Sequence, residues 1–289
     1  MALAAARVQI QCTAKGGSGA GAHVSPAILD RIGSALQRAA GGFVSQHTAA
    51  AGKVILAVFA HPDDETTAAG GTIARHVRDG GVAHLVCATR GEMGTLGSNG
   101  LVLQREELGA VRERELRGVL RSYGAQPPVM LGYRDAEVKD APFEEIVGKV
   151  AEVMQRVRPD VVLTFGPLGI SRHDDHIALH KATVEAFHRY RRESGAQARL
   201  LYTAIPKSFL ENPEVPLKLD GPETEPTHFV DIRETITMKL AALRSYRSQE
   251  DAQWVADLFE RMQTSQEVFH QVYPALPPGT ERQGLWSEG

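Results

Sequence analysis

Residues 54–65 read Val-Ile-Leu-Ala-Val-Phe-Ala-His-Pro-Asp-Asp-Glu, an unbroken apolar run that ends in a histidine and three acids. The run is short and rich in β-forming residues, as expected for a buried parallel strand, and the segment that follows, from Thr66 toward Val77, is typical of a helix. Open α/β sheets carry their chemistry at the carboxyl ends of such strands. The order of strand, polar turn and helix therefore predicts both the fold class and the edge of the sheet that holds the site.

The polar turn after this strand contains side chains of the kind that bind a metal ion. His61 and Asp64 lie three residues apart in one tight turn and can reach the same cation. The adjacent Asp63 is left free to act as a base.

The second half of the site follows another predicted buried strand, residues 160–165, which the glycines at 166 and 169 interrupt. The next polar stretch contains His173 and His176, and the apolar spacing after it is helical, so both histidines lie one turn apart at a helix start. His61, Asp64 and His176 together make an open set of two imidazoles and one carboxylate, which leaves a coordination position for water. His173 lies beside that set.

These residues carry a family resemblance. The Ala-His-Pro-Asp-Asp-Glu turn at 60–65 and the later His-Asp-Asp-His turn at 173–176 are similar to the two signatures of the PIG-L/LmbE family of zinc-dependent N-acetylglucosaminide deacetylases. The likeness extends to Thr-Arg-Gly-Glu at 89–92, to Tyr-Arg-Asp at 133–135 and to the segment 239–249. It thus covers about residues 53 to 250.

The resemblance implies a role for each matching residue. By position, His61, Asp64 and His176 would hold zinc, and Asp63 would be the general base. His173 would stabilise the oxyanion or protonate the leaving amine, and Asp175 would orient it. Iron(II) is an alternative metal, because this ligand set suits both ions.

Several positions depart from the family pattern, among them Ala136 and Glu137, where the family commonly has Ser-Gly after Arg-Asp. The family more often has proline where this chain has Asp174, some relatives have a tyrosine where it has Ser171, and a histidine is often seen in place of Tyr246. These changes concern substrate recognition more than the hydrolytic chemistry. Glu65 is expected either to cap its helix or to face the substrate.

Candidate substrate contacts come from the ends of the second and third strands. Glu92, Arg134 and Asp135 follow these strands at the same predicted edge, where they can either hydrogen-bond sugar hydroxyls or serve ordinary turn roles. The charged residues 112–115 are predicted to form a solvated helix face. His176 and His180 also form an i, i+4 pair, but the glutamate of the zincin motif is missing between them.

Composition restricts the class of protein. The formal net charge of −3 gives no basic surface for nucleic acid, and no window approaches the roughly 18 consecutive apolar residues of a membrane span. Cys12 and Cys87 are poorly placed for a disulfide, and Cys87 is expected to be an inert buried thiol. We expect a cytoplasmic enzyme with a small N-acetylated sugar as its partner; its oligomeric state is not readable from the sequence.

The chain divides into an extension and one domain. Residues 1–50 are rich in Ala and Gly, with one candidate helix over 26–40, and are predicted to lie outside the deacetylase domain of residues 51–289. The rest alternates between strands and helices, which predicts a Rossmann-like, mostly parallel sheet with helices on both faces and a small C-terminal helical addition. The predicted strands are 53–60, 82–89, 128–132, 160–165, 199–205 and 228–232, and the predicted helices are 66–79, 103–123, 143–157, 174–193, 234–247 and 251–272.

The function predicted from these features is removal of the N-acetyl group from an N-acetylglucosamine-type conjugate, which yields a free amine and acetate. Two alternatives remain at this point. A metal-dependent phosphoesterase would use the clustered Asp and His residues to hold two metals. A non-catalytic sugar-binding protein on the same fold would have no evident need for Asp63 and His173.

Overall fold

The computed structural model describes residues 49–213, 215 and 217–287. The predicted extension lies almost entirely outside these residues, and so does the candidate helix over 26–40. Among the residues described, no helix has both the length and the apolar character needed to cross a bilayer.

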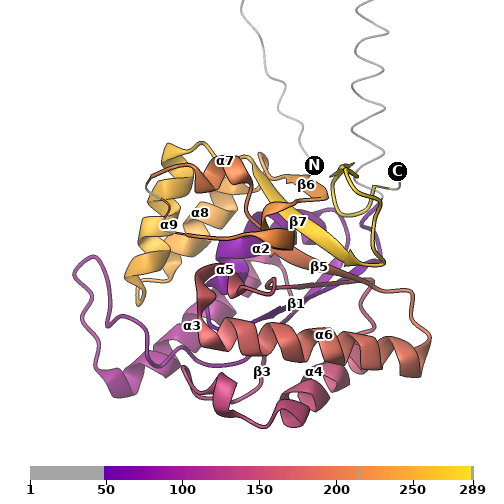
Figure 1. Ribbon diagram of the computed structural model, residues 1–289. Coiled ribbons are helices and arrows are strands. Elements are labelled where there is room, and N and C mark those ends of the chain that lie inside the picture. The colour runs from indigo at the N-terminus through magenta and orange to yellow at the C-terminus, as the bar shows by residue number, and fades with distance from the viewer. Residues whose placement is uncertain (1–48, 214, 216, 288–289) are drawn as a thin grey trace, which may run out of the picture. The chain divides into compact units, whose positions relative to one another are not determined.

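One eight-stranded sheet organises the described part of the chain, in the order β3-β2-β1-β4-β5-β7-β6-β8 (Figure 1). The first five strands in this order are parallel, β7 is antiparallel to both β5 and β6, and β8 is parallel to β6. The strands are β1 (Val54–Phe59), β2 (Val82–Cys87), β3 (Val129–Met130), β4 (Val161–Thr164), β5 (Arg199–Ala204), β6 (His228–Asp231), β7 (Gln266–Tyr273) and β8 (Arg282–Gln283).

Helices cover both faces of this sheet, as predicted. In one group of helices, α2 packs against α3 and α8, and α8 packs against α9. In the other group, α4 packs against α6. Figure 1 shows these two groups on opposite sides of the sheet. The helices are α2 (Asp64–Arg78), α3 (Arg105–Tyr123), η1 (Val138–Asp140), α4 (Phe143–Val157), α5 (Gly169–Arg172), α6 (Asp174–Ser194), α7 (Lys207–Leu210), η2 (Gly221–Thr224), α8 (Ile236–Ser245) and α9 (Glu250–Arg261).

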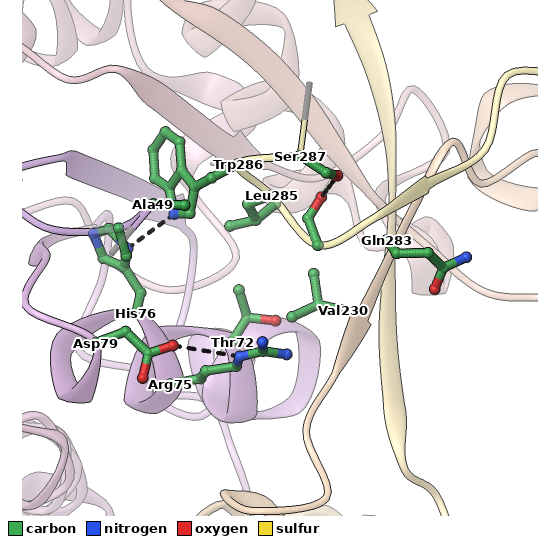
Figure 2. Close-up of a pocket in the computed structure, with 12 residues that line it drawn as sticks. Ala49, Thr72, Arg75, His76, Asp79, Val230, Gln283, Leu285, Trp286 and Ser287 are labelled. Carbon is green, nitrogen blue, oxygen red and sulfur yellow. Dashed lines mark hydrogen bonds and ion pairs between the residues drawn. The ribbon is translucent and has the colours of Figure 1, made fainter. Parts of the chain in front are cut away.

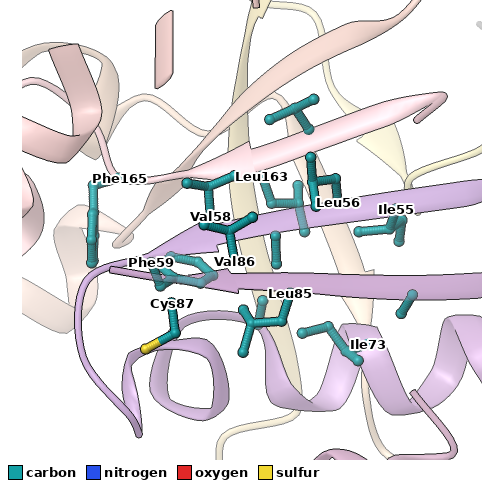
Figure 3. Packing of buried hydrophobic residues seen from close by; sticks show 14 of the residues in the cluster. Ile55, Leu56, Val58, Phe59, Ile73, Leu85, Val86, Cys87, Leu163 and Phe165 are labelled. Atoms are coloured by element: carbon teal, nitrogen blue, oxygen red, sulfur yellow. The ribbon is translucent and has the colours of Figure 1, made fainter. Parts of the chain in front are cut away.

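The core lies around the strand that opens the first motif. Every residue of β1 from Ile55 to Phe59 is fully buried, and Figure 3 shows its side chains among those of β2, β4 and α2. Burial of each large apolar side chain contributes about 1.5–3 kcal/mol. The rings of Phe59 and Phe165 meet edge to face with centroids 5.0 Å apart, which joins the ends of the two strands that carry the site. Cys87 is buried in this core, as predicted, and burial raises the pKa of its thiol well above the ordinary value.

The predicted helix over 251–272 is wrong beyond its middle. Helix α9 ends at Arg261, Gln263 takes a left-handed φ of 50°, and Gln266–Tyr273 form strand β7. This strand is inserted between β5 and β6, where it pairs on both sides. Pairing with two remote strands therefore decides its conformation.

Candidate active site

The sheet order brings the two sequence motifs together. Strands β1 and β4 are neighbours, but the chain continues from β1 to β2 on one side and from β4 to β5 on the other. Loops that leave two such strands in opposite directions open a crevice at their carboxyl ends. His61 follows β1 and His176 lies in the first turn of α6 after β4, so both reach this crevice.

The turn after β1 is held in an uncommon conformation. Asp63, the residue before α2, has a φ of 111°, a region that costs a non-glycine residue about 1–3 kcal/mol. Two local hydrogen bonds support it: the His61 N–H donates to Asp64 Oδ2 at 2.7 Å, and the Asp63 N–H donates to Glu65 Oε2 at 3.1 Å. The turn thereby directs the side chains of His61 and Asp64 toward one small volume.

Three ligand-type atoms face one another in that volume. His61 Nδ1 lies 3.0 Å from His176 Nε2 and 3.5 Å from Asp64 Oδ2, and the last two atoms are 3.4 Å apart. Tetrahedral ligands at the usual Zn–N and Zn–O distances lie about 3.3 Å from each other. The triangle therefore fits a divalent ion bound to all three atoms.

In both imidazoles, the nitrogen that faces away from the triangle contacts an oxygen atom, as is usual for histidines that bind a metal. His176 Nδ1 lies 2.9 Å from the carbonyl of Gly169, which can only accept, so Nδ1 carries the proton and Nε2 keeps its lone pair. The ring also stacks on Phe165, with centroids 4.0 Å apart. His61 Nε2 faces Asp135 Oδ1 at 3.0 Å and Asp175 Oδ2 at 3.4 Å. Such outer partners set the tautomer and orientation of a ligating histidine.

Two further groups of side chains are close enough to share an ion. These are His61 with His173 and His176, and His61 with Asp135 and Asp175; in each, the ligand atoms lie within 4.8 Å of one another. The described residues thus contain His/Asp groups able to hold a metal. In the set with Asp64 all three mutual distances are 3.5 Å or less, and Asp135 and Asp175 are also engaged by backbone N–H groups.

Those engagements are specific. Asp175 accepts the N–H groups of Ala136 and Val138 at 2.7 and 3.1 Å, and Asp135 accepts that of Met93 at 2.9 Å. Burial would raise the pKa of Asp135, but its contacts with His61 and with the Met93 N–H lower it to about 2.

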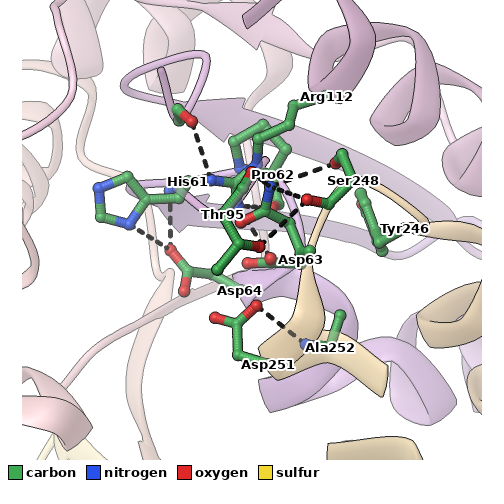
Figure 4. A network of polar contacts seen from close by, with 12 residues as sticks. His61, Pro62, Asp63, Asp64, Thr95, Arg112, Tyr246, Ser248, Asp251 and Ala252 are labelled. Atoms are coloured by element: carbon green, nitrogen blue, oxygen red, sulfur yellow. Dashed lines mark hydrogen bonds and ion pairs between the residues drawn. The ribbon is translucent and has the colours of Figure 1, made fainter. Parts of the chain in front are cut away.

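Asp63 lies beside the triangle without belonging to it. Its Oδ2 accepts a 2.8 Å hydrogen bond from Arg112 Nη2, at the centre of the polar network in Figure 4. Burial raises the pKa of the Asp63 carboxyl well above its ordinary value, and the charge of Arg112 opposes that shift. The prediction that Arg112 lies on a solvated helix face is wrong, because only 4% of it is exposed.

His173 lies on the exposed side of the site. It is exposed and precedes α6, and its ring meets that of His61 edge to face at 4.8 Å. The sequence predicts that Asp175 orients this ring. In the structure the contact comes from the Asp175 backbone N–H, which donates to His173 Nδ1 at 3.2 Å, while the carboxylate holds the 136–138 segment.

The chain matches known proteins in both sequence and structure. The model of the GlcNAc-PI de-N-acetylase (PIG-L) family matches residues 56–187. A 1D-myo-inositol 2-acetamido-2-deoxy-alpha-D-glucopyranoside deacetylase of Mycobacteroides abscessus is 32% identical over 228 residues, which cover 68% of this chain and 81% of the relative. This chain belongs to the PIG-L family.

Two further relatives of this PIG-L protein are informative. A probable N-acetyl-alpha-D-glucosaminyl L-malate deacetylase 2 of Bacillus cereus is 32% identical over 199 residues, which cover 68% of this chain and 84% of that protein. The solved N,N'-diacetylchitobiose deacetylase of Pyrococcus horikoshii has a TM-score of 0.57 and 26% identity, and covers 79% of this chain and 88% of its own. The family and the fold class predicted from the sequence are confirmed.

Tyr246, one of the departures from the family pattern, forms a buried pair with Glu65. Its hydroxyl donates to Glu65 Oε1 at 2.6 Å, and the Thr66 hydroxyl donates to the same atom at 2.5 Å. Burial raises the pKa of both groups. Glu65 thus supports the Asp63 backbone from inside the protein and does not reach the surface.

The predicted substrate contacts differ in exposure. Asp135 is buried, and its backbone N–H donates to Glu92 Oε2 at 3.2 Å, so Glu92 joins the two strand-end loops. Arg134 is exposed and pairs with Glu137 at 3.0 Å. Among the three candidates, Arg134 is the one whose side chain lies open to solvent.

A separate cavity of about 520 Å³ lies at the far end of α2 (Figure 2). Its lining includes Thr72, Arg75 and His76 from the helix and Leu285 and Trp286 from the C-terminal segment. None of the predicted site residues lines it.

Proposed function

We propose that this PIG-L protein is a metal-dependent N-deacetylase in which His61, Asp64 and His176 hold one divalent ion and Asp63 is the base. The enzyme class predicted from the sequence, a deacetylase, is confirmed by family membership and by the deacetylases to which the chain is similar. The observation that carries the proposed site is the triangle of ligand atoms 3.0–3.5 Å apart with the Asp63 carboxylate beside it.

The donor set narrows the identity of the metal. Two neutral imidazoles and one carboxylate with an open position suit zinc, and they also suit iron(II). Zinc is our proposal. When bound, the ion supplies Lewis acidity, which polarises the amide carbonyl and acidifies the attacking water.

The side chains around the ion divide the proton transfers between them. Asp63 takes a proton from water as the water oxygen bonds to the carbonyl carbon of the acetamide. His173 donates to the developing oxyanion and then to the nitrogen as the C–N bond breaks. One water is consumed, and the products are acetate and a free amine.

The substrate proposal is an N-acetylglucosamine-type conjugate. The inositol, malate and chitobiose names of the three similar deacetylases differ in the group attached to the sugar, and they share an acetylated amino sugar. We therefore propose the acetamide of the sugar as the reacting group. We propose that Arg134 and the loops of Glu92 and Asp135 meet the attached group.

The test combines metal analysis with amine release. Purified protein is assayed for bound zinc and iron and for turnover of a panel of N-acetylglucosaminides with neutral, anionic and disaccharide aglycones. About one ion per chain and amine release from the panel are expected. Two ions with turnover of phosphate esters would support a phosphoesterase, and saturable sugar binding without turnover would support a binding protein.

A further inference from the structure

Glu223 is a buried acid that binds the backbone of the turn between β4 and α6. Its side chain is fully buried. Its Oε2 accepts the Leu168 N–H at 3.0 Å, and its Oε1 accepts the Ile170 N–H at 3.1 Å. Burial raises the pKa of this carboxyl, and the two N–H groups oppose that shift. Both carboxylate oxygens are thus engaged by one short stretch of backbone.

Glu223 is itself fixed to the sheet. The Ile205 N–H, just beyond β5, donates to the Glu223 carbonyl at 2.8 Å, and this anchors the short helix η2 that carries the acid. A Cβ atom at Gly166 would overlap the Glu223 side chain, so the turn fits closely around it. The carboxylate is therefore a fixed point for the turn.

The turn needs such support because part of its backbone is strained. Ile170 has a φ of 59° and a ψ of −57°, and a positive φ is a genuine outlier for a β-branched residue. Such a conformation costs about 1–3 kcal/mol and persists only where the surrounding structure holds it. One of the two N–H groups bound by Glu223 belongs to Ile170 itself.

The peptide group held by Glu223 also contacts a proposed metal ligand. The Ile170 N–H and the Gly169 carbonyl belong to one planar trans peptide group, so they point in opposite directions. On one side the N–H donates to Glu223, and on the other the carbonyl faces His176 Nδ1 at 2.9 Å. Hydrogen bonds in such a chain polarise one another, so the carboxylate makes the carbonyl a stronger acceptor.

We propose that Glu223 is a positioning residue for His176: it holds and polarises the peptide group between Gly169 and Ile170, which keeps the His176 proton on Nδ1 and directs the Nε2 lone pair toward the metal. Partners behind a ligating histidine set its tautomer, its orientation and its basicity. This inference rests on the proposed function, because His176 is a metal ligand proposed there. Glu223 itself holds neither the metal nor the substrate.

The experiment compares Glu223→Gln with the wild-type protein. Glutamine has the size of glutamate but only one oxygen, so one of the two N–H groups loses its acceptor. We expect zinc affinity, measured by competition with a chelator, to fall by about 10–100-fold. In the zinc-free protein, NMR of the histidine ring nitrogens should show His176 as one Nδ1–H tautomer in the wild type and as a mixture of tautomers in the variant. Glu223→Asp keeps the charge with a shorter reach and should fall between the two; it tests the inference if Glu223→Gln does not fold.

The matched control is Glu225→Gln, which changes an exposed acid of the same segment and should leave zinc affinity and the His176 tautomer unchanged. An equal loss of affinity in this control would overturn the inference. So would a lower free energy of unfolding in Glu223→Gln with wild-type zinc affinity and tautomer, because Glu223 would then serve folding alone. A higher KM with unchanged zinc affinity would overturn it as well, since Glu223 would act on the substrate.

Failure of the inference and failure of the proposed function give different results. The NMR comparison needs neither metal nor substrate, so it tests the link between Glu223 and His176 directly. Failure of the wild-type protein to release amine would overturn the proposed function instead.

Discussion

The two turns that form the site differ in how much protein surrounds them. The turn after β1 is enclosed: Asp63 is bound by Arg112, and Glu65 is bound by Tyr246 and Thr66 in the interior. The turn after β4 is open: His173 is exposed, and the neighbouring Asp174 pairs with Lys139 at the surface. The side that carries the proposed base, Asp63, is thus fixed by many contacts, whereas the proposed acid, His173, is exposed.

This contrast matches what each side has to do. A base must hold one atom against a water molecule, so restraint by several elements is useful. An acid that protonates a leaving group needs access to it, and the exposed position of His173 gives that access. We therefore expect substitutions on the enclosed side to affect many substrates equally and those on the open side to depend on the leaving group.

The largest expected effect comes from His61→Ala or His176→Ala. Each opens the ligand triangle, so bound metal and activity should both fall by more than the roughly 10–100-fold that loss of an outer partner costs. Asp63→Asn keeps the ligands and should lose about 10²–10⁴-fold in kcat with full metal content. Metal analysis beside kcat makes the distinction; metal loss in Asp63→Asn with retention in His61→Ala would reverse the assignment.

The next effect tests the open side. His173→Ala should lower kcat toward an unactivated sugar acetamide by about 100-fold, because the amine leaves without a proton. An activated aryl acetate ester needs no such proton, and its hydrolysis should change little. Asp174→Asn, which alters the exposed neighbour, is the matched control. Equal losses for amide and ester would mean that His173 does not protonate the leaving group.

A smaller effect is expected at the boundary between the two sides. Asp135→Asn removes the charge that faces His61 Nε2 at 3.0 Å, so metal affinity should fall by about 10–100-fold. Competition with a chelator measures this, with the exposed Glu137→Gln as the control. If the affinity stays constant while KM for the sugar rises, Asp135 contacts the substrate, as the sequence analysis allowed.

The smallest expected effect is on the free energy of unfolding, and it concerns the buried hydrogen bond between Tyr246 and Glu65. Tyr246→Phe removes a 2.6 Å hydrogen bond to the buried Glu65 and should lower the free energy of unfolding by about 1–3 kcal/mol. In Tyr133→Phe the lost hydroxyl contacts Glu145 at the surface, so a change within about 0.5 kcal/mol is expected. Urea unfolding of both variants makes the comparison. Equal stability would show that the enclosed turn does not depend on Tyr246.

The sequence by itself determined the features that depend on near neighbours. The apolar run of β1 and its polar turn predicted the strand, the sheet edge that carries the site and the His61, Asp63, Asp64 group, because an apolar run and tight-turn spacing are local properties. The second turn, with His173 and His176, was predicted for the same reason.

Only the tertiary structure decided the features that join distant segments. Arg112 reads as one charge among several on a helix, and its burial depends on the loop at 91–94 folding over it. Tyr246 meets Glu65 across 181 positions of the chain. Strand β7 was mistaken for helix because its conformation is set by pairing with β5 and β6. In each case the deciding partner is remote in sequence, so the residue's own neighbours carry no signal of it.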